Sequence, residues 1–285
     1  MSIQWYPGHM VKARKAIEQA MPAQDVVIEV LDARMPRASE NPLVAELRGR
    51  KPCVKVLSKS DLADPEVTAA WLRHFEAESD GRSPERGRVV AVAVTTQSPA
   101  EVRKRISETC RAVATPTRGR KHPRAMIVGI PNVGKSTLVN TLAKRKVANV
   151  GDEPAVTKAG QVVQLEDGIT LLDNPGIMWP KIEDPIGGLC LAFGGAIPDG
   201  ALDYESVALF GAARLGERYA ELLARRYKLD VLPASADALL DEIGRRRGCL
   251  RSGGRVDRHK AADILIHDFR TGAIGRISLE RPGDD

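Results

Sequence analysis

The chain has 285 residues, of which 43% are hydrophobic and 28% charged; this is an ordinary globular composition and excludes a disordered or fibrous protein. It contains no apolar run of the ~18–20 residues that span a bilayer, no signal peptide, and four scattered cysteines without zinc-site or disulfide spacing. We therefore expect a soluble, cytoplasmic protein without a membrane partner, and the net charge of +6 favours an acidic partner.

Up to about residue 112, the chain alternates between buried strands and helices. The apolar runs predict strands at 26–31, 53–57 and 89–94. Helical spacing and proline starts predict helices at 11–20, 43–47, 65–77 and 99–112. Strands that alternate with helices in this way predict a parallel sheet with helices on its faces, which is an α/β fold.

Residues 129–136 read Gly-Ile-Pro-Asn-Val-Gly-Lys-Ser, which is the G-x-x-x-x-G-K-S pattern of a phosphate-binding P-loop. An apolar strand at 125–128 precedes the loop and a helix follows it, as phosphate binding requires. We expect Lys135 to reach the β- and γ-phosphates and Ser136 to hold Mg²⁺. The residues expected to contact the nucleotide here are Asn132, Val133, Gly134, Lys135, Ser136 and Thr137.

The chain beyond the P-loop changes character near residue 200. An irregular stretch at 151–160 leads into two strands, 161–165 and 169–173, joined by a tight Asp-Gly turn. From residue 201 the periodicity is helical, apart from one strand predicted at 274–279. We therefore predict an α/β domain over residues 1–200 and an all-α domain over residues 201–285.

Three further motifs are those of a GTP-binding domain. Thr157 lies in the loop after the P-loop helix, and Asp173 precedes Pro175-Gly176 at a strand end. Both are expected to complete a Mg²⁺ site with Ser136, and Gly176 is expected to contact the nucleotide. Ser58-Lys59-Ser60-Asp61 stands at another strand end, where an Asn/Thr-Lys-x-Asp motif reads guanine. The predicted ligands are GTP and Mg²⁺.

The order of these motifs is permuted. Residues 58–61 precede the P-loop, whereas ordinary GTPases place their base-reading motif after it. All the motifs still follow parallel strands, whose carboxyl ends bind ligands in open α/β sheets. A circular permutation therefore preserves the site, and it leads the segment after Asp173 directly into the helical domain.

In these motifs the chain resembles the circularly permuted ribosome-assembly GTPases of the ribosome biogenesis GTPase A family. The resemblance spans essentially the whole chain and is carried by residues 4–10 (Gln-Trp-Tyr-Pro-Gly-His-Met), 32–36, 129–136, 173–177, 245–250 and 276–279. It implies GTP hydrolysis coupled to late maturation of the large ribosomal subunit, with binding to the rRNA and proteins of its precursor. We expect hydrolysis to be slow alone and stimulated by the ribosome. We also expect rRNA binding in the GTP state, release after hydrolysis, and a monomer.

Two departures from the family lie at the base-reading site. Where the family usually has asparagine, Ser58 is shorter and can make only part of the contact with guanine and the P-loop. Thr95-Thr96 stand where the family has an Asn-Ser pair near the base. Asp61 can still accept from two guanine donors that adenine lacks, so the predicted nucleotide remains GTP; the effect of Ser58 on guanine affinity does not follow from the sequence.

Water activation needs a residue other than the glutamine of many GTPases, because Ile177 follows Pro175-Gly176. His9 is the leading candidate, since it is titratable near neutral pH, follows a glycine, and is the residue to which the resemblance also points. The alternative is that His9 caps the first helix or packs beside Trp5. The predicted catalytic residues are His9, Lys135 and Thr157.

Asn132 offers a second route to catalysis. In related potassium-dependent GTPases, an asparagine at this place in the P-loop helps to hold a monovalent cation that neutralises charge as an arginine finger does. The alternative is an asparagine that only braces the loop. K⁺ is therefore a candidate cofactor.

Two stretches of the chain are rich in basic residues. Residues 111–124 carry five and no acids, and residues 241–260 carry seven against three acids. A charge run is usually a solvated face, but two such runs in a basic protein favour contacts with RNA phosphates. Since aromatic residues make up only 4%, we expect recognition of RNA by shape and backbone and not by base stacking.

Two alternative functions stay open. One is a P-loop ATPase or small-molecule kinase, against which Asp61 and the lack of a substrate-binding lid argue; competition of labelled GTP by ATP distinguishes it. The other is a nucleotide-gated RNA-binding scaffold with negligible turnover. That function is favoured if His9→Ala leaves hydrolysis unchanged while RNA binding still depends on nucleotide.

Overall fold

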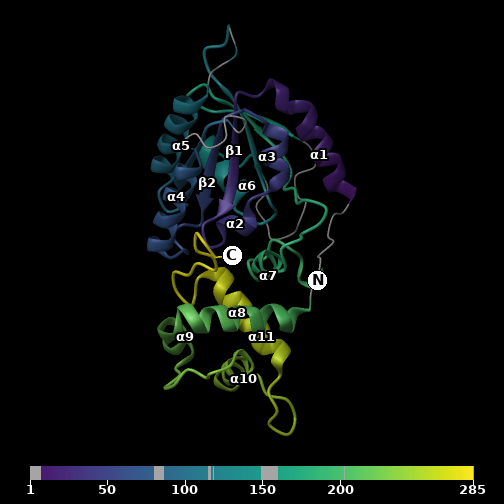
Figure 1. Ribbon diagram of the computed structural model, residues 1–285, viewed down its shortest axis with the longest axis vertical. Coiled ribbons are helices and arrows are strands. Elements are labelled where there is room, and N and C mark those ends of the chain that lie inside the picture. The colour runs from purple at the N-terminus through teal and green to yellow at the C-terminus, as the bar shows by residue number, and fades with distance from the viewer. Residues whose placement is uncertain are drawn as a thin grey trace. The chain divides into compact units, whose positions relative to one another are not determined.

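The structure is a computed structural model that describes residues 8–79, 87–114, 117, 119–148, 160–201 and 203–284 (Figure 1). The chain divides into two compact units. The first runs to Lys181 and also takes in the chain from Glu280 onward, and the second is Ile182–Leu279. None of the helices in the described ranges is long and apolar enough to cross a membrane. All four cysteines are free and buried, as their spacing predicts.

The first unit is built on one six-stranded sheet with the strand order β3-β2-β1-β4-β6-β5. All neighbouring strands are parallel except the edge strand β5, which is antiparallel to β6. The strands are β1 (Val26–Asp32), β2 (Cys53–Ser58), β3 (Val89–Ala93), β4 (Arg124–Gly129), β5 (Gln161–Gln164) and β6 (Thr170–Asp173). The predicted fold class, a parallel-rich sheet flanked by helices, is confirmed.

Helices connect these strands and flank the sheet on both sides in Figure 1. Several begin with proline at the first helical position, where its fixed φ and missing N–H cost nothing. They are α1 (Gly8–Ala20), the 3₁₀ turn η1 (Met21–Ala23), α2 (Pro36–Ser39), α3 (Pro42–Arg48), α4 (Pro65–Ser79), α5 (Pro99–Val113) and α6 (Lys135–Ala143). Each predicted helix of this unit is present within three residues of its expected ends.

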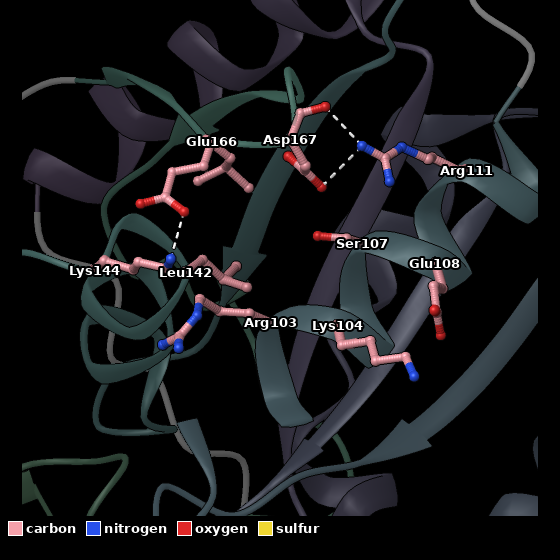
Figure 2. Close-up of a pocket in the computed structure, with 10 residues that line it drawn as sticks. Arg103, Lys104, Ser107, Glu108, Arg111, Leu142, Lys144, Glu166 and Asp167 are labelled. Carbon is pink, nitrogen blue, oxygen red and sulfur yellow. Dashed lines mark hydrogen bonds and ion pairs between the residues drawn. The ribbon is translucent and has the colours of Figure 1, made fainter. Parts of the chain in front are cut away.

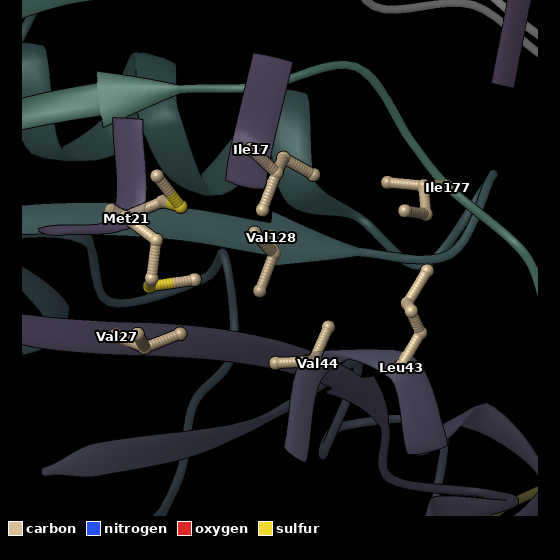
Figure 3. Packing of buried hydrophobic residues seen from close by; sticks show 8 residues of the cluster. Ile17, Met21, Val27, Leu43, Val44, Val128 and Ile177 are labelled. Carbon is tan, nitrogen blue, oxygen red and sulfur yellow. The ribbon is translucent and has the colours of Figure 1, made fainter. Parts of the chain in front are cut away.

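An apolar cluster fixes α1 against the sheet (Figure 3). Ile17 of α1 and Met21 of η1 pack with Val27 of β1 and Val128 of β4. Ile177, which follows β6, belongs to the same cluster and is fully buried. Because α1 runs back along the parallel strands before β1 begins, its first turn lies toward the carboxyl edge of the sheet.

The second unit is helical. Asp203, Ser235 and Asp257 cap three of its helices by accepting backbone N–H groups, which explains where those helices begin. Helices α8 and α11 pack against each other, and α10 packs against both. The elements are α7 (Pro185–Phe193), η2 (Asp199–Ala201), α8 (Tyr204–Arg218), α9 (Ala220–Tyr227), α10 (Ala236–Arg246) and α11 (Arg258–Thr271).

The division at 181/182 differs from the boundary of 200/201 expected from periodicity. Helix α7 belongs to the helical unit because Phe193 packs on Phe269, with ring centroids 4.6 Å apart. Arg270 of α11 also donates to the carbonyls of Ala192 and Phe193, at 2.9 and 3.1 Å. The side chain of Arg270 therefore caps the last carbonyls of α7. At the other end of the unit, the chain returns to the first unit from Glu280.

The strand predicted over Ile274–Leu279 is wrong. Ile274, Ile277 and Leu279 are buried as a strand would have them, but side chains take the place of a neighbouring strand. The Tyr219 hydroxyl bonds both N and O of Ser278, at 3.1 and 3.2 Å. Arg218 donates to the Leu279 carbonyl, at 3.2 Å. Residues 274–279 therefore form no strand in the described chain.

Candidate functional site

Four loops that carry predicted site residues follow the parallel strands β2, β3, β4 and β6. They are residues 58–61, 95–97, 130–136 and 174–177. Because parallel strands end at the same edge of a sheet, all four loops meet there. The structure thus brings the motifs that precede the P-loop in the sequence together with the P-loop and the motif that follows it.

The P-loop turns into α6 through two residues with positive φ. Asn132 has φ +58° and Gly134 has φ +92°, and Gly134 is the residue that caps the helix. A side chain at Gly134 would be strained in this backbone conformation. Lys135 and Ser136 stand in the first turn of α6, where backbone N–H groups and the helix dipole favour a phosphate.

Lys135 and Asp173 form a buried pair, with 2.5 Å between Nζ and Oδ1. The other carboxylate oxygen of Asp173, Oδ2, is buried and has no hydrogen-bond partner among the described residues. A buried carboxylate oxygen with a free acceptor fits Mg²⁺, which prefers oxygen ligands. The serine hydroxyl required for the same ion follows Lys135 directly, so the residues present fit a nucleotide-bound Mg²⁺.

Ser58 joins the base-reading loop to the P-loop. Its hydroxyl Oγ lies 2.5 Å from the carbonyl oxygen of Val133 and 2.8 Å from that of Leu31. A hydroxyl has one proton, so it donates to one of these carbonyls at a time. The short serine side chain therefore reaches the phosphate loop directly.

Lys59 makes a second connection to the same loop. Its Nζ donates to the Asn132 carbonyl and to Asp32 Oδ2, each at 2.8 Å. Asp32 also accepts two hydrogen bonds from the buried guanidinium of Arg34, at 2.8 and 3.0 Å. Burial by itself would raise the pKa of Asp32, but Arg34 and Lys59 outweigh it and hold the pKa well below its usual range. Asp32 is thus a fixed negative charge that orients Lys59.

Asp61 lies beside the loop that follows β3. The Gln97 side chain donates to Asp61 Oδ2 at 3.3 Å, and the backbone N–H of Gln97 donates to Thr95 Oγ1 at 3.2 Å. Ser60 N donates to the carbonyl of Val94 at 3.2 Å. The structure therefore brings Ser60, Asp61 and Thr95 together, and Thr96 is exposed next to them.

Gln97 is a site residue that the sequence interpretation missed. It stands immediately after Thr95-Thr96, at the same strand end, so the argument that selected those two residues could have included it.

Gly176 and Ile177 fix the segment after β6. A Cβ on Gly176 would lie 3.2–3.3 Å from backbone atoms of Pro131, so a side chain here would press on the P-loop backbone. Ile177 N donates to the Gly129 carbonyl at 3.1 Å, and the Ile177 carbonyl accepts from Asn41 at 2.9 Å. Its alkyl side chain is in the apolar cluster, so it cannot act on water at the site.

Two predicted catalytic residues fall wholly or partly outside the described structure. Thr157 lies in residues 149–159, which the structure does not describe. His9 is described only by its backbone, in the first turn of α1.

The chain was compared with known proteins. The family described as 50S ribosome-binding GTPase matches residues 124–196, which contain the P-loop and the Asp173 motif. Ribosome biogenesis GTPase A of Bacillus licheniformis is 43% identical, with 100% of each chain covered.

The chain belongs to the ribosome biogenesis GTPase A family. It is accordingly a GTPase, which binds and hydrolyses GTP, and its permuted motif order is consistent with this family. Mitochondrial ribosome-associated GTPase 1 of Mus musculus is 30% identical, with 97% of this chain and 90% of the relative covered. The crystal structure of GNP-bound YlqF from T. maritima is similar with a TM-score of 0.66 and 28% identity, covering 96% of this chain and 100% of that one.

Proposed function

We propose that this GTPase acts as a monomer in late maturation of the large ribosomal subunit. It binds rRNA of the subunit precursor in the GTP state and leaves after hydrolysis. The observation that supports this nucleotide-controlled role best is the direct joining of Ser58 and Lys59 to the carbonyls of Val133 and Asn132. Through these bonds, the base and the phosphates of one nucleotide are held by loops that are far apart in the sequence. The names of the curated relatives support the ribosomal role.

For the phosphate end of the site, we propose that Lys135 binds the β- and γ-phosphates. Ser136, Asp173 and Thr157 would hold Mg²⁺, which neutralises phosphate charge when it is bound. Lys135 then exchanges its contact with Asp173 Oδ1 for phosphate oxygens, and the carboxylate becomes available to the ion. The backbone N–H groups of residues 132–137 complete the phosphate site.

For the base, we propose that Asp61 accepts from the two donors on the guanine edge. Gln97 holds the carboxylate in place, and Lys59 packs along the ring plane from its position between Asp32 and Asn132. The remaining contacts come from Ser58, Ser60, Thr95 and Thr96. Since Ser58 is occupied with Val133, it contributes little to guanine itself.

For hydrolysis, we propose that His9 orients the attacking water. Ile177 supplies no polar side chain after Gly176, and α1, which begins at Gly8, packs through Ile17 in the apolar cluster that also contains Ile177. Removal of a general base typically lowers the rate by about 10²–10⁴-fold. His9→Ala should lower single-turnover hydrolysis by this amount with GTP affinity unchanged, whereas Lys12→Ala on the same helix should not. An unchanged rate in His9→Ala would rule the histidine out.

For a monovalent cation, we propose that Asn132 helps to bind K⁺ next to the phosphates. Its positive φ places it at the tightest part of the loop. Hydrolysis should then be faster in KCl than in NaCl at equal ionic strength, and Asn132→Ala should remove the difference. Equal rates of the wild-type chain in the two salts contradict this role.

The whole proposal is tested by co-sedimentation with bacterial large ribosomal subunits. We expect the chain to bind subunits with a non-hydrolysable GTP analogue and to bind much more weakly with GDP. Subunits should also accelerate GTP hydrolysis, which is otherwise slow. Equal binding in both nucleotide states, or equal hydrolysis with and without subunits, contradicts the proposed coupling.

A further inference from the structure

A groove of about 270 Å³ lies between α5, the end of α6 and the turn that joins β5 to β6 (Figure 2). Four cationic side chains line it, Arg103, Lys104, Arg111 and Lys144, together with three acids. Helix α6 begins in the P-loop and ends at this groove, and β6 likewise runs from here to Asp173. The groove therefore lies at the opposite end of the sheet from the nucleotide loops.

Two of the three acids in the groove are already paired. Glu166 forms an ion pair with Lys144, drawn as a dashed line in Figure 2. Arg111 donates to the Asp167 carbonyl at 2.6 Å and lies 3.3 Å from its carboxylate Oδ2. Glu108 is the third acid. After these two pairs, Arg103 and Lys104 remain in the lining with Glu108, so the lining keeps a small net positive charge.

Four cations at this place are exposed and make no side-chain hydrogen bond or ion pair within the described ranges: Lys104, Lys121, Arg145 and Lys146. Lys104 lines the groove, and Arg145 and Lys146 directly follow Lys144. Lys121 precedes His122, whose ring lies against the β5–β6 turn, since a Cβ on Gly168 would be 2.7 Å from it. The free cations thus either line the groove or stand within two residues in the sequence of a side chain that contacts the β5–β6 turn.

The groove exposes no large apolar side chain to a protein partner, because the two leucines in its lining, Leu142 and Leu165, are buried. The exposed large hydrophobic residues of the described chain are Val11, Val162, Ile186, Val231 and Leu250, and none of them lines the groove. Protein interfaces depend on buried aromatic and aliphatic anchors, whereas RNA contacts are dominated by cations on phosphates. A surface with free lysine and arginine side chains and no such anchor fits an RNA backbone.

We propose that the basic surface at this groove, with Lys104 in its lining and Lys121, Arg145 and Lys146 beside it, binds the phosphate backbone of RNA in the large ribosomal subunit. The proposal rests on the ribosomal function proposed above and names a second contact surface for it, within the GTPase unit itself. Its contacts are electrostatic and independent of base sequence.

The structure also connects this surface to the nucleotide site. Asn140 of α6 accepts from Val147 N and Ala148 N, both at 2.8 Å, and donates to the Ala148 carbonyl at 2.8 Å. These bonds hold the basic turn on the helix that begins in the P-loop. Thr157 follows Ala148 by nine residues. The proposed RNA-binding surface is therefore adjacent in the sequence both to the phosphate-binding segment and to the segment that carries Thr157, a proposed Mg²⁺ ligand.

The test is the salt dependence of binding to purified bacterial large subunits, in the presence of the non-hydrolysable GTP analogue. The test variant is Arg145→Glu/Lys146→Glu, and the control is Arg50→Glu/Arg73→Glu, which changes the net charge equally. Both control arginines are exposed and have no partner among the described residues. Loss of two phosphate contacts should lower the slope of log K against log salt by about 1–2 units in magnitude, and affinity at 0.1 M salt by on the order of ten-fold per contact. GDP affinity and the melting temperature check that both variants fold.

The outcomes are distinct. A reduced slope and affinity in the test variant alone supports the groove, both with subunits and with protein-free rRNA. If both variants lose binding equally, or neither does, the proposed role of the groove in RNA binding is contradicted, while the proposed ribosomal function is not. If the test variant loses subunit binding but binds protein-free rRNA normally, the partner is a ribosomal protein and the RNA proposal is overturned. If the wild-type chain binds no subunits, both the function and the groove fail.

Discussion

Two basic regions of this GTPase have similar compositions but differ in what their charges do. In residues 241–260 of the helical unit, five of the seven basic side chains are ion-paired within the unit: Arg245, Arg246, Arg247, Arg251 and Arg258. Around the groove of the GTPase unit, four exposed cations have no such partner in the described chain.

The difference shows that the number of basic residues in a segment does not measure its capacity to bind RNA. Arg258 alone contacts Asp241, Asp237 and Glu205, and so ties α11 to α10 and α8. A cation held by three carboxylates is already neutralised, and a phosphate must compete for it. We therefore infer that the paired arginines stabilise the fold and that the free cations bind a partner. Four measurements test this inference, in decreasing order of expected effect.

The largest effect is expected at Asp32, whose ion pair with Arg34 is the most completely buried of those between described residues. Asp32→Ala leaves Arg34 buried without its counter-ion, which should destabilise the first unit by about 3–5 kcal/mol. Thermal unfolding should detect this as a large fall in melting temperature, and Arg73→Ala, an exposed control, should change stability by less than about 0.5 kcal/mol. A cost below about 1 kcal/mol for Asp32→Ala contradicts the structural role of the pair.

Glu29 is expected to make stability depend on pH near neutrality. Burial, and then repulsion by Glu40, raises the pKa of Glu29 to about 7 despite the attraction of Lys55. The folded-state pKa lies above the unfolded value of 4.5, so the folded state favours protonated Glu29. The stability that this provides is fully present below pH 4.5 and is lost as pH rises through 7. Its size is at most about 3.5 kcal/mol, because the pKa rises from 4.5 to about 7 and one pKa unit corresponds to about 1.4 kcal/mol.

The measurement for Glu29 is the melting temperature between pH 5 and pH 8. The wild-type chain should lose stability across this range, and Glu29→Gln should flatten the profile because the amide does not titrate. An identical slope in both proteins would show that Glu29 is not the group responsible.

A smaller effect is expected at Arg258. Its ion pairs are partly exposed, and such pairs contribute about 0.2–1 kcal/mol each, so Arg258→Ala should cost roughly 1–2 kcal/mol. Arg255 is the matched control, because its exposed side chain has no partner in the described structure. If chemical unfolding gives the same free energy of unfolding for Arg258→Ala and Arg255→Ala, the paired arginine contributes no more to stability than the unpaired one.

The smallest effect on stability is expected in the groove. Arg145→Glu/Lys146→Glu removes no contact within the described chain, so its free energy of unfolding should change by no more than about 0.5 kcal/mol. A loss of several kcal/mol would mean that these cations hold the fold, and the contrast between the two regions would disappear.

The sequence predicted the sheet and its helices closely because buried strands between proline-started helices leave few other arrangements. It failed where side chains replace a strand. Ile274, Ile277 and Leu279 are apolar and buried, but Tyr219 and Arg218, about 60 residues away in the chain, bond the backbone groups of this segment.

The site was predictable as far as its motifs are local. The positions of Ser58, Lys59, Asp61 and the P-loop follow from strand ends, and the structure places them at one edge. The pairing of charges was not predictable, because the partners of Arg258 come from two other helices. The same holds for the bond from Lys59 to Asn132, which depends on the three-dimensional approach of two loops.

The central claim is that Ser58–Asp61 reads the guanine of the nucleotide whose phosphates lie on residues 129–136. The most direct measurement compares GTP and XTP affinities of the wild-type chain and Asp61→Asn. A carboxylate accepts from the two guanine donors, whereas an amide can donate to the carbonyl that xanthine carries in place of the amino group. We predict that Asp61→Asn weakens GTP binding about 10–100-fold and tightens XTP binding. An unchanged ratio of the two affinities would contradict the assignment of the base-reading loop.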